Sequence, residues 1–460
     1  MSPADGPRRP APAAALEVCA LVAVGAAAVA LSWRLLHTAA NYDEGVYLAA
    51  TDALRHGQAL GSQVFAAQLP GFYDLLRGLS AVAGLTVDRM RAAMLFTYTT
   101  GVVGAWLIGR RYGGLRGGAL TAGLFIVAPP LDLFAPDVLA DPPSLALSIL
   151  AVGLATIEGP IAAVCAGLVI CAAVSVKLTA ITAIPALLWF LRRRVVATAA
   201  GAAALAAVLL AAHAHALGSL WASGVTYHVR ARSTPAVIPH PYRQIFEQMP
   251  ARTPFVWFAI AALVAAVIAT ALRRLRVQVW PLWLWLALAW GFLLLQQPLH
   301  PNHLILVPGT LAIAAGATLA AMLPRHTAVY AAVGVVLAAA YVQQWHRVDV
   351  AYAPEPASNV AAAHALARLT TGRMLVVDDR PIISFLAGRR VVGPLVDLAL
   401  LRFETKSLTQ AAVERDLAGA GAVVVSRQLR DEPRVLAYVR ARFTKRYDAG
   451  GVVVYVRRDS

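Results

Sequence analysis

The sequence predicts a polytopic α-helical membrane protein that ends in a small C-terminal α/β domain. Of its 460 residues, 59% are hydrophobic and only 14% are charged, and the mean hydropathy is +0.65. Soluble domains rarely have this balance. The apolar residues come in blocks of roughly 17 to 23, which is the length that crosses ~30 Å of hydrocarbon as a helix. After residue 346 these blocks give way to shorter apolar runs, which indicates a separate domain.

About eleven apolar blocks are predicted to span the membrane. They cover residues 15–36, 91–109, 117–134, 142–157, 160–176, 177–191, 195–217, 254–272, 279–296, 303–323 and 327–345. The first block follows Arg8 and Arg9, as the core of a signal peptide would, but it is too long and lacks a clear cleavage site. We therefore expect a retained anchor after a cytoplasmic tail at 1–14. Together the spans form a transmembrane module over 15–346.

The arginines predict how the spans are oriented. With these spans and a cytoplasmic N-terminus, every basic cluster between spans lies on the cytoplasmic side, as the positive-inside rule requires. The clusters are Arg110/Arg111/Arg116, Arg192/Arg193/Arg194, Arg273/Arg274/Arg276 and Arg325. A further span at 70–85 would reverse this arrangement. That stretch carries Asp74 and Arg77, so we expect an interfacial or re-entrant helix within one long external loop, 37–90.

The residues after the last span are predicted to form an extracytoplasmic α/β domain. Pro354 and Pro356 indicate a linker over 347–357, and the domain then covers 358–460. Alternating apolar runs predict strands at 374–377, 422–425 and 452–456, with helices near 358–370, 381–387 and 408–418. Asp378 and Asp379 follow the first strand, and we expect them in a surface turn without a catalytic role.

Two adjacent carboxylates follow the first span directly. Asp43 and Glu44 lie in Asn41-Tyr42-Asp43-Glu44-Gly45-Val46-Tyr47, at the outer interface. A helix cap would account for such a pair by itself. Neighbouring carboxylates also raise one another's pKa or share a cation, so the pair suits a general base or a metal site.

Other polar groups belong to the same predicted external face. Asp137 and Asp141 lie on the second external loop, where Asp141 also suits a helix cap. Lys177 lies at the outer end of two spans, where it either binds a phosphate or extends to the interface. The remaining candidates are Tyr47, Tyr73, Arg230, His300 and His303. His300 and His303 could also bind a metal, although this spacing alone is weakly specific.

Composition argues against several other functions. The net charge of +16 comes from residues at the ends of apolar blocks, so we expect no nucleic-acid partner. No Gly-rich phosphate loop or cytoplasmic domain is present to hold a nucleotide. Cys19, Cys165 and Cys171 lie in apolar segments without paired or metal-ligand spacing, and we interpret them as small buried hydrophobes.

The order of these motifs resembles membrane glycosyltransferases of the GT-C fold, near the protein O-mannosyltransferase and aminoarabinose transferase branch. Tyr42 to Tyr47 resembles that family's Asp-Glu motif in the first external loop. Gln68-Leu69-Pro70-Gly71-Phe72-Tyr73 resembles its Pro-aromatic segment, except that Gly71 stands where the family often has a second proline. Val176-Lys177-Leu178-Thr179 resembles its Lys-Thr stretch, and 300–303 lies where the family has a polar loop that contacts the donor.

The resemblance implies an inverting transfer of a sugar from a polyprenyl-phosphate donor to an acceptor hydroxyl of a lipid, glycan or protein, outside the plasma membrane. Asp43 would be the general base, and Glu44 would orient the acceptor or tune Asp43. Lys177, with Arg230 or His303, would neutralise the departing phosphate. No nucleotide or redox cofactor is expected. A divalent metal stays open, with Asp43 and Asp137 as its ligands.

Two other interpretations fit a polytopic chain. Ionisable residues in such a protein also occur along the substrate path of a transporter or flippase. Transporters usually place these groups near the membrane midplane and contain inverted repeats, whereas the ionisable residues here gather on one face. A non-catalytic scaffold with an external binding domain is the third interpretation, and it would leave Asp43, Asp137 and Lys177 free to vary.

Overall fold

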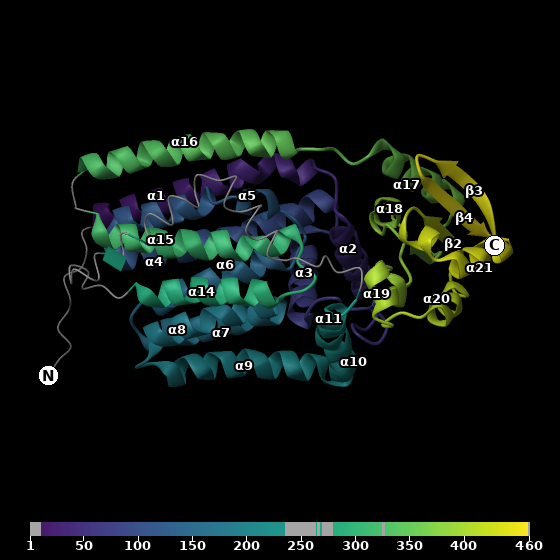
Figure 1. The fold of residues 1–460 in the computed structure, drawn as a ribbon, viewed down its shortest axis with the longest axis horizontal. Helices are drawn as coiled ribbons and strands as arrows, with labels where there is room; N and C mark the ends of the chain where they lie inside the picture. Colours follow the sequence, from purple (N-terminus) through teal and green to yellow (C-terminus); the bar gives the residue numbers. More distant parts are fainter. Residues whose placement is uncertain (1–10, 235–263, 265–266, 269–278, 324–326, 459–460) are drawn as a thin grey trace.

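The computed structural model describes residues 11–234, 264, 267–268, 279–323 and 327–458. A bundle of long helices makes up most of the molecule, and an α/β domain lies at one end of it (Figure 1). Helix α16 runs along the bundle and leads into this domain. The predicted fold class, a polytopic helical membrane protein with a C-terminal α/β domain, is confirmed.

Apolar helices occupy the predicted spans, except that 254–272 lies largely outside the described residues. The bundle consists of α1 (Ala11–Ser32), α4 (Val87–Ile126), α6 (Asp141–Ala155), α7 (Pro160–Val176), α8 (Ile184–Leu191), α9 (Val195–His213), α14 (Trp280–Leu295), α15 (Leu306–Met322) and α16 (Thr327–Ala351). Within the described part of the chain, five helices are long and apolar enough to cross a membrane, and the other apolar helices are shorter.

Helix α4 covers the predicted span 91–109 and the first part of the predicted span 117–134. The backbone leaves helical geometry at Gly113 and at Gly114, whose φ of 62° suits a residue without a side chain. The chain then turns back on itself. The two segments approach so closely that a Cβ on Gly109 would lie only 2.1 Å from the carbonyl oxygen of Gly117. The two halves therefore form a tight antiparallel pair. The second half ends at Ile126, earlier than predicted.

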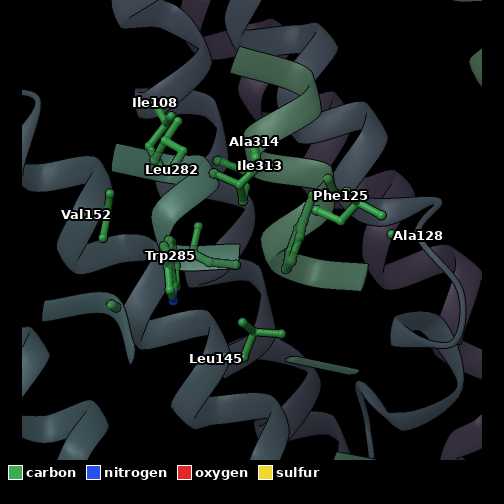
Figure 2. Packing of buried hydrophobic residues seen from close by; sticks show 14 of the residues in the cluster. Ile108, Phe125, Ala128, Leu145, Val152, Leu282, Trp285, Ile313 and Ala314 are labelled. Atoms are coloured by element: carbon green, nitrogen blue, oxygen red, sulfur yellow. The ribbon is translucent and has the colours of Figure 1, made fainter. Parts of the chain in front are cut away.

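Small residues also allow other helices to pack closely. A Cβ on Gly167 of α7 would lie 2.0 Å from the carbonyl oxygen of Thr198, and a Cβ on Gly201 of α9 would lie 2.2 Å from that of Val164. Such contacts are typical of helices that associate in lipid. The main apolar cluster joins α4, α6, α14 and α15, and Figure 2 shows Phe125, Trp285 and Ile313 among its side chains.

Short helices cover the end of the bundle that faces the C-terminal domain (Figure 1). The helix predicted at 70–85 is present as α3. The set consists of η1 (Trp33–His37), α2 (Tyr42–Arg55), α3 (Pro70–Ala83), α5 (Leu131–Phe134), η2 (Leu178–Ala183), η3 (Ala214–Ala216), α10 (Leu217–Trp221), η4 (Ala222–Thr226), α11 (Tyr227–Ala231) and η5 (Pro301–Ile305).

The C-terminal domain contains one four-stranded sheet in the order β1-β2-β4-β3. Strands β1 and β2 are parallel, and β4 is antiparallel to both β2 and β3. Its elements are α17 (Ala357–Leu369), β1 (Val376–Asp378), α18 (Ile382–Leu386), η6 (Gly393–Leu395), α19 (Leu400–Glu404), α20 (Gln410–Leu417), β2 (Ala422–Val425), η7 (Gln428–Asp431), α21 (Pro433–Arg442), β3 (Phe443–Ala449) and β4 (Val452–Arg457). The three predicted strands and three predicted helices are confirmed.

The prediction for Asp378 and Asp379 is wrong, because both residues are buried. Asp378 accepts hydrogen bonds from the backbone N–H groups of Arg380 and Ser384, at the start of α18. Asp379 accepts backbone N–H bonds from 426, 427 and 429 and so ties β1 to the loop after β2. The paired carboxylates therefore organise buried backbone instead of facing solvent.

The C-terminal domain docks onto α2. An apolar cluster runs from Tyr47 and Leu48 of α2 to Ile382 and Ile383 of α18. Contact is close at Gly45, where a Cβ would lie 2.8 Å from the backbone nitrogen of Ile382. Helix α16 reaches Ala351, so the extended linker is 352–356, shorter than the predicted 347–357.

Candidate active site

A cavity of about 520 Å³ lies where the helix bundle meets the C-terminal domain. Residues of α2, α11 and η5 form part of its wall, together with short loops between helices. The C-terminal domain adds Asp397, Ala399, Leu401 and Gln428. The predicted site residues in the wall are Asp43, Tyr47, Asp141, Lys177, His300 and His303. Residues from distant parts of the sequence thus meet in one chamber.

Asp43 reaches the cavity because α2 begins immediately before it. Asn41 is the N-cap of this helix, and its side chain accepts the N–H of Glu44 at 2.9 Å. The carboxylate of Glu44 in turn accepts the N–H of Asn41 at 3.1 Å, which completes a capping box. Asp43 lies in the first turn with its side chain on the cavity wall.

The surroundings of Asp43 suit a proton acceptor. The pKa of its carboxyl is raised from 3.8 to about 6, chiefly by burial and then by the negative charge of Asp397. The ammonium of Lys177 opposes this shift. A carboxylate with a pKa near 6 is still ionised at neutral pH, yet it binds a proton more readily than an ordinary aspartate.

Glu44 does not line the cavity, and of its two predicted roles, orienting the acceptor or tuning Asp43, its position favours the second, because its charge raises the pKa of Asp43. Its side chain is fully buried and paired with Arg91, with Arg91 Nη2 2.6 Å from Glu44 Oε2 and Nε 2.9 Å from Oε1. The N–H of Val138 also donates to Glu44 Oε1, at 2.9 Å. Arg91 donates further to the carbonyl groups of residues 35, 36, 38 and 39. Glu44 therefore holds the scaffold around Asp43.

Lys177 faces the cavity from the end of α7. Its Nζ lies 2.6 and 2.7 Å from the two carboxylate oxygens of Asp141, and Asn302 Nδ2 donates to the same carboxylate at 2.8 Å. The sequence suggested that Asp141 caps a helix, but Asp141 is the first residue of α6 and Ala140 is the N-cap. The triad brings together α6, α7 and η5. The ammonium of Lys177 is thus part of the cavity wall, and its buried partner Asp141 fixes its position.

The two histidines of the 300–303 loop lie on the same wall. His303 is buried, and its Nδ1 lies 2.8 Å from Gln296 Nε2 and accepts the N–H of His300 at 3.2 Å. In the part of the chain that the structure describes, no three His, Cys, Asp or Glu side chains are arranged to hold a metal ion. The side-chain amide of Gln296 and the backbone N–H of His300 orient the imidazole of His303.

Three other predicted residues lie away from the cavity. Asp137 is buried near Glu44 and Arg91, and its Oδ2 lies 3.4 Å from Asn41 Nδ2. Arg230 of α11 and Arg232 just after it are both exposed, and of the two Arg232 lies in the cavity wall. Tyr73 is fully buried and packs edge-on against Tyr47, with 6.2 Å between the ring centroids.

Asp397, the carboxylate that the C-terminal domain contributes to the cavity, belongs to none of the predicted motifs. Its Oδ1 accepts from Tyr42 Oη at 3.0 Å, and Tyr42 Oη accepts the N–H of Leu398 at 2.9 Å. One signal was available: Asp397 is the only charged residue in the apolar run from 391 to 401. A lone acid in an apolar run requires a buried partner or a function.

Known proteins were compared with the chain by sequence and by structure. No family model and no curated protein matches it by sequence. The structure is similar to that of ArnT from Cupriavidus metallidurans bound to undecaprenyl phosphate, with a TM-score of 0.66 and 15% identity over 96% of this chain and 97% of that one. It is also similar to an oligosaccharyltransferase from Archaeoglobus fulgidus in the apo form, with a TM-score of 0.55 and 11% identity over 96% of this chain and 74% of that one.

A second structure of the archaeal protein, named AglB and bound to an inhibitory peptide and a dolichol-phosphate, gives a TM-score of 0.53 at 12% identity. It covers 96% of this chain and 74% of that one. These similarities extend over the helix bundle and the C-terminal domain alike. This chain therefore has the GT-C fold of polytopic membrane glycosyltransferases, as the resemblance of its motifs predicts.

Proposed function

We propose that this protein transfers a sugar from a polyprenyl-phosphate donor to an acceptor hydroxyl at the outer surface of the plasma membrane. The observation that carries the proposal is one cavity, at the end of an apolar helix bundle, in which Asp43 and Lys177 occur together. A donor with a lipid tail and a charged head requires both an apolar and a polar environment. The ArnT and AglB structures, which share the fold, hold undecaprenyl phosphate and a dolichol-phosphate.

Asp43 acts as the general base in this proposal. Its carboxylate takes the proton of the acceptor hydroxyl while the hydroxyl oxygen forms a bond to the anomeric carbon of the sugar. The bond from that carbon to the phosphate oxygen breaks, and its electron pair leaves with the polyprenyl phosphate. Attack from the face opposite the phosphate inverts the anomeric centre. Proton transfer of this kind contributes typically about 10² to 10⁴-fold to a rate.

Lys177 and Arg232 receive the departing phosphate. Both line the cavity, and Lys177 Nζ is preorganised by Asp141. Fixed cations stabilise charge that develops in a transition state more than mobile ones do, because they require no reorganisation. Arg232 replaces Arg230 in this role, because Arg230 does not line the cavity. His303 lies on the same wall and supplies a further polar contact.

The proposed steps need no nucleotide or redox cofactor, because the phosphate of the donor is already a leaving group. No step passes through a metal. Turnover measured before and after EDTA treatment tests whether a divalent ion takes part. The identities of the sugar and the acceptor follow from the assay below, in which each is varied.

The test uses purified protein with a panel of radiolabelled polyprenyl-phosphate sugars and candidate acceptors. The wild type is expected to turn over at least one donor, and Asp43→Asn should lower the rate by at least roughly 100-fold. A fully active Asp43→Asn enzyme would rule out the proposed base. No turnover with any donor would favour the transporter interpretation.

Asp448→Asn is the matched control, because Asp448 is an exposed aspartate of β3 whose ion pair, within the described residues, is with Lys445. It should retain wild-type turnover. Asp43→Asn should also unfold at a temperature no lower than the wild type. The fold raises the pKa of Asp43, so its ionised form costs stability above about pH 6, and the amide removes that cost. Loss of activity then cannot be attributed to unfolding.

A further inference from the structure

A second cavity, of about 650 Å³, lies at the other end of α2 from Asp43. The end of α2 and the turn between α3 and α4 line it, together with Gly372 and residues of 385–390 from the C-terminal domain. Among the described residues, none lines both this cavity and the one that contains Asp43. Asp52 follows Asp43 at a distance of roughly 13 Å along the helix axis. The second cavity is therefore separate from the candidate active site.

Positive charge exceeds negative charge in the second cavity. Three arginines and two aspartates line it, so the formal charges of these side chains add up to +1. They are Arg55, Arg389, Arg390, Asp52 and Asp88. The volume is within the range of small-molecule sites, about 300 to 1,000 Å³. An anionic group of a ligand would balance the remaining charge, whereas a cation would increase it.

The aspartates already have positive neighbours. Asp52 interacts electrostatically with Arg55 and Arg390, and Asp88 Oδ2 lies 3.1 Å from Nδ1 of His37. Arg389 is held by backbone carbonyl groups of 367, 370, 387 and 388 and by the hydroxyl of residue 370. These bonds fix its guanidinium without neutralising it. The side chain of Arg390 forms no hydrogen bond within the described residues, so its donors are available to a ligand.

The second cavity lies at the level of the membrane surface. Its residues Thr86 and Asp88 belong to the beginning of α4, an apolar helix long enough to cross a membrane. The ion pair with His37 brings this beginning beside η1, where Trp33 is 53% exposed. Exposed tryptophans of membrane helices are typical of the headgroup level. Further along α4, Phe96 is 75% exposed, as expected of a side chain that faces lipid tails.

We propose that the second cavity binds the phosphate of an anionic phospholipid of the phosphatidylglycerol class, and that this lipid links the end of α2 to the C-terminal domain. One phosphodiester carries a single negative charge and neutralises the net +1, whereas a zwitterionic lipid brings no net charge. Guanidinium groups bind phosphate oxygens through charge-assisted hydrogen bonds. The acyl chains leave the cavity past Leu85 and Leu386, two apolar residues of its lining, and enter the bilayer beside α4.

This lipid is not the sugar donor, because the donor phosphate of the proposed function lies at Lys177, in the other cavity. The inference therefore goes beyond sugar transfer and does not depend on it. The lipid would act as a structural ligand at the boundary between the helix bundle and the C-terminal domain.

Native mass spectrometry of the full-length protein in detergent tests the proposal. With phosphatidylglycerol and phosphatidylcholine at equal mole fractions, the wild type should retain one phosphatidylglycerol in preference. Arg55→Gln/Arg390→Gln should weaken its binding by roughly fivefold for each arginine, whereas Arg55→Lys/Arg390→Lys keeps both charges and should retain most of it. Equal retention of the two lipids by the wild type overturns the proposal, as does unchanged binding in the glutamine variant.

Arg446→Gln is the matched control, because Arg446 is an exposed arginine of β3 outside the second cavity. It should bind phosphatidylglycerol like the wild type. Arg389 is left unchanged in these variants, because its hydrogen bonds hold the backbone. Should the double glutamine variant fail to fold, Arg390→Gln alone gives the same comparison at a side chain without a hydrogen bond in the described part of the chain.

The unfolding temperature distinguishes a lipid from a free phosphate. In protein stripped of lipid, phosphatidylglycerol should raise the unfolding temperature of the wild type and of Arg446→Gln more than that of Arg55→Gln/Arg390→Gln. Inorganic phosphate should have a much smaller effect, and an equal effect of inorganic phosphate overturns the assignment to a lipid. If phosphatidylglycerol binds as expected but no donor is turned over, the sugar-transfer proposal fails and the lipid site stands.

Discussion

At the scale of single residues, two adjacent carboxylates have opposite surroundings. Successive residues of a helix point about 100° apart, so Asp43 and Glu44 cannot face the same side of α2. Asp43 faces the cavity, where burial and Asp397 raise its pKa. Glu44 faces the scaffold, where Arg91 and the N–H of Val138 hold its charge. One carboxylate is thus available to a substrate and the other is not.

Sugar transfer should depend on the ionisation of Asp43. Because the base must be deprotonated and its pKa is about 6, kcat/KM should be constant above that pH. Below it, kcat/KM should fall roughly tenfold per pH unit as the carboxyl gains its proton. Initial rates in overlapping buffers at constant ionic strength measure the profile. A flat profile down to about pH 4, near the ordinary value of an aspartate, would contradict the assigned base.

Removing the charge of Lys177 should weaken donor binding more than acceptor binding. Lys177→Met leaves the carboxylate of Asp141 with Asn302 as its remaining side-chain partner. The double variant Lys177→Met/Asp141→Asn also removes the charge of the Asp141 carboxylate that Lys177 no longer neutralises. It therefore reports the loss of the Lys177 contact with the donor phosphate alone. Both should raise the KM for the donor by roughly tenfold or more, with a smaller change in the KM for the acceptor. Lys445→Met, at an exposed site of β3, is the control. An equal rise in both KM values would argue against a phosphate role.

The sequence could predict some residues of the site but not their partners. Asp43, Lys177 and the 300–303 loop were found because each is a polar group at the end of an apolar block. Glu44, Asp137 and Arg230 do not line the cavity, which the sequence could not show, since the spacing of residues along the chain does not tell which side of a short helix enters a cavity. Asp397 was missed because it lies in another domain, and only the docking of that domain brings it to Asp43.

At the scale of the elements, Arg91 provides hydrogen-bond donors for backbone carbonyl groups between α1 and α2. It lies on α4 and donates to carbonyl groups at the end of η1 and in the loop before α2. Glu44 on α2 completes the group and also accepts the N–H of Val138 in a third segment. The first turn of α2, and with it Asp43, is therefore fixed by a buried ion pair.

Breaking this ion pair should destabilise the fold. Glu44→Gln leaves the guanidinium of Arg91 buried with only carbonyl partners and a neutral amide, and removal of one partner of a buried pair costs about 3 to 5 kcal/mol. The unfolding temperature of the purified protein, measured with a fluorescent reporter, should fall clearly. Glu404→Gln provides a control at a glutamate outside the cavity. A Glu44→Gln protein that unfolds like the wild type yet has lost all turnover would instead place Glu44 in the chemistry.

Periodicity predicted the elements of the fold unequally well. Long apolar blocks were recognised as helices because burial in lipid leaves few polar residues in them. Strands β1, β2 and β4 were recognised because their residues are nearly all apolar. Strand β3 was missed, because six of its seven residues are partly or fully exposed and its sequence, Phe-Thr-Lys-Arg-Tyr-Asp-Ala, lacks an apolar alternation. An edge strand with one covered face gives only a weak signal.

At the scale of the whole molecule, the cavity lies at one end of the bundle and basic turns lie at the other. Arg110 pairs with Glu17 at 2.6 Å, which places this turn beside the beginning of α1, away from the C-terminal domain (Figure 1). Arginine-rich ends of apolar helices stay in the cytoplasm. The bundle is therefore expected to carry the cavity and the C-terminal domain on the outer side, where lipid-linked donors and envelope acceptors would meet.

Single cysteines test this orientation. Cys19, Cys165 and Cys171 would first be replaced by alanine, and one cysteine would then be introduced at either of two exposed positions. Lys445 lies on the C-terminal domain and Arg193 lies in the basic turn before α9. In intact cells, a membrane-impermeant maleimide should label Lys445→Cys and not Arg193→Cys, whereas permeabilised cells should show both.

The reverse pattern would place Asp43 and Lys177 on the cytoplasmic side and contradict the proposed site of transfer, even for a protein that proves active after purification. The expected pattern would have a further consequence, because a base that opens to the outside meets the external pH. Since Asp43 loses its charge as the pH falls through about 6, acidification of the medium around intact cells should slow transfer, while acidification of the cytoplasm alone should not. Product formation in cells with separately clamped internal and external pH measures the difference.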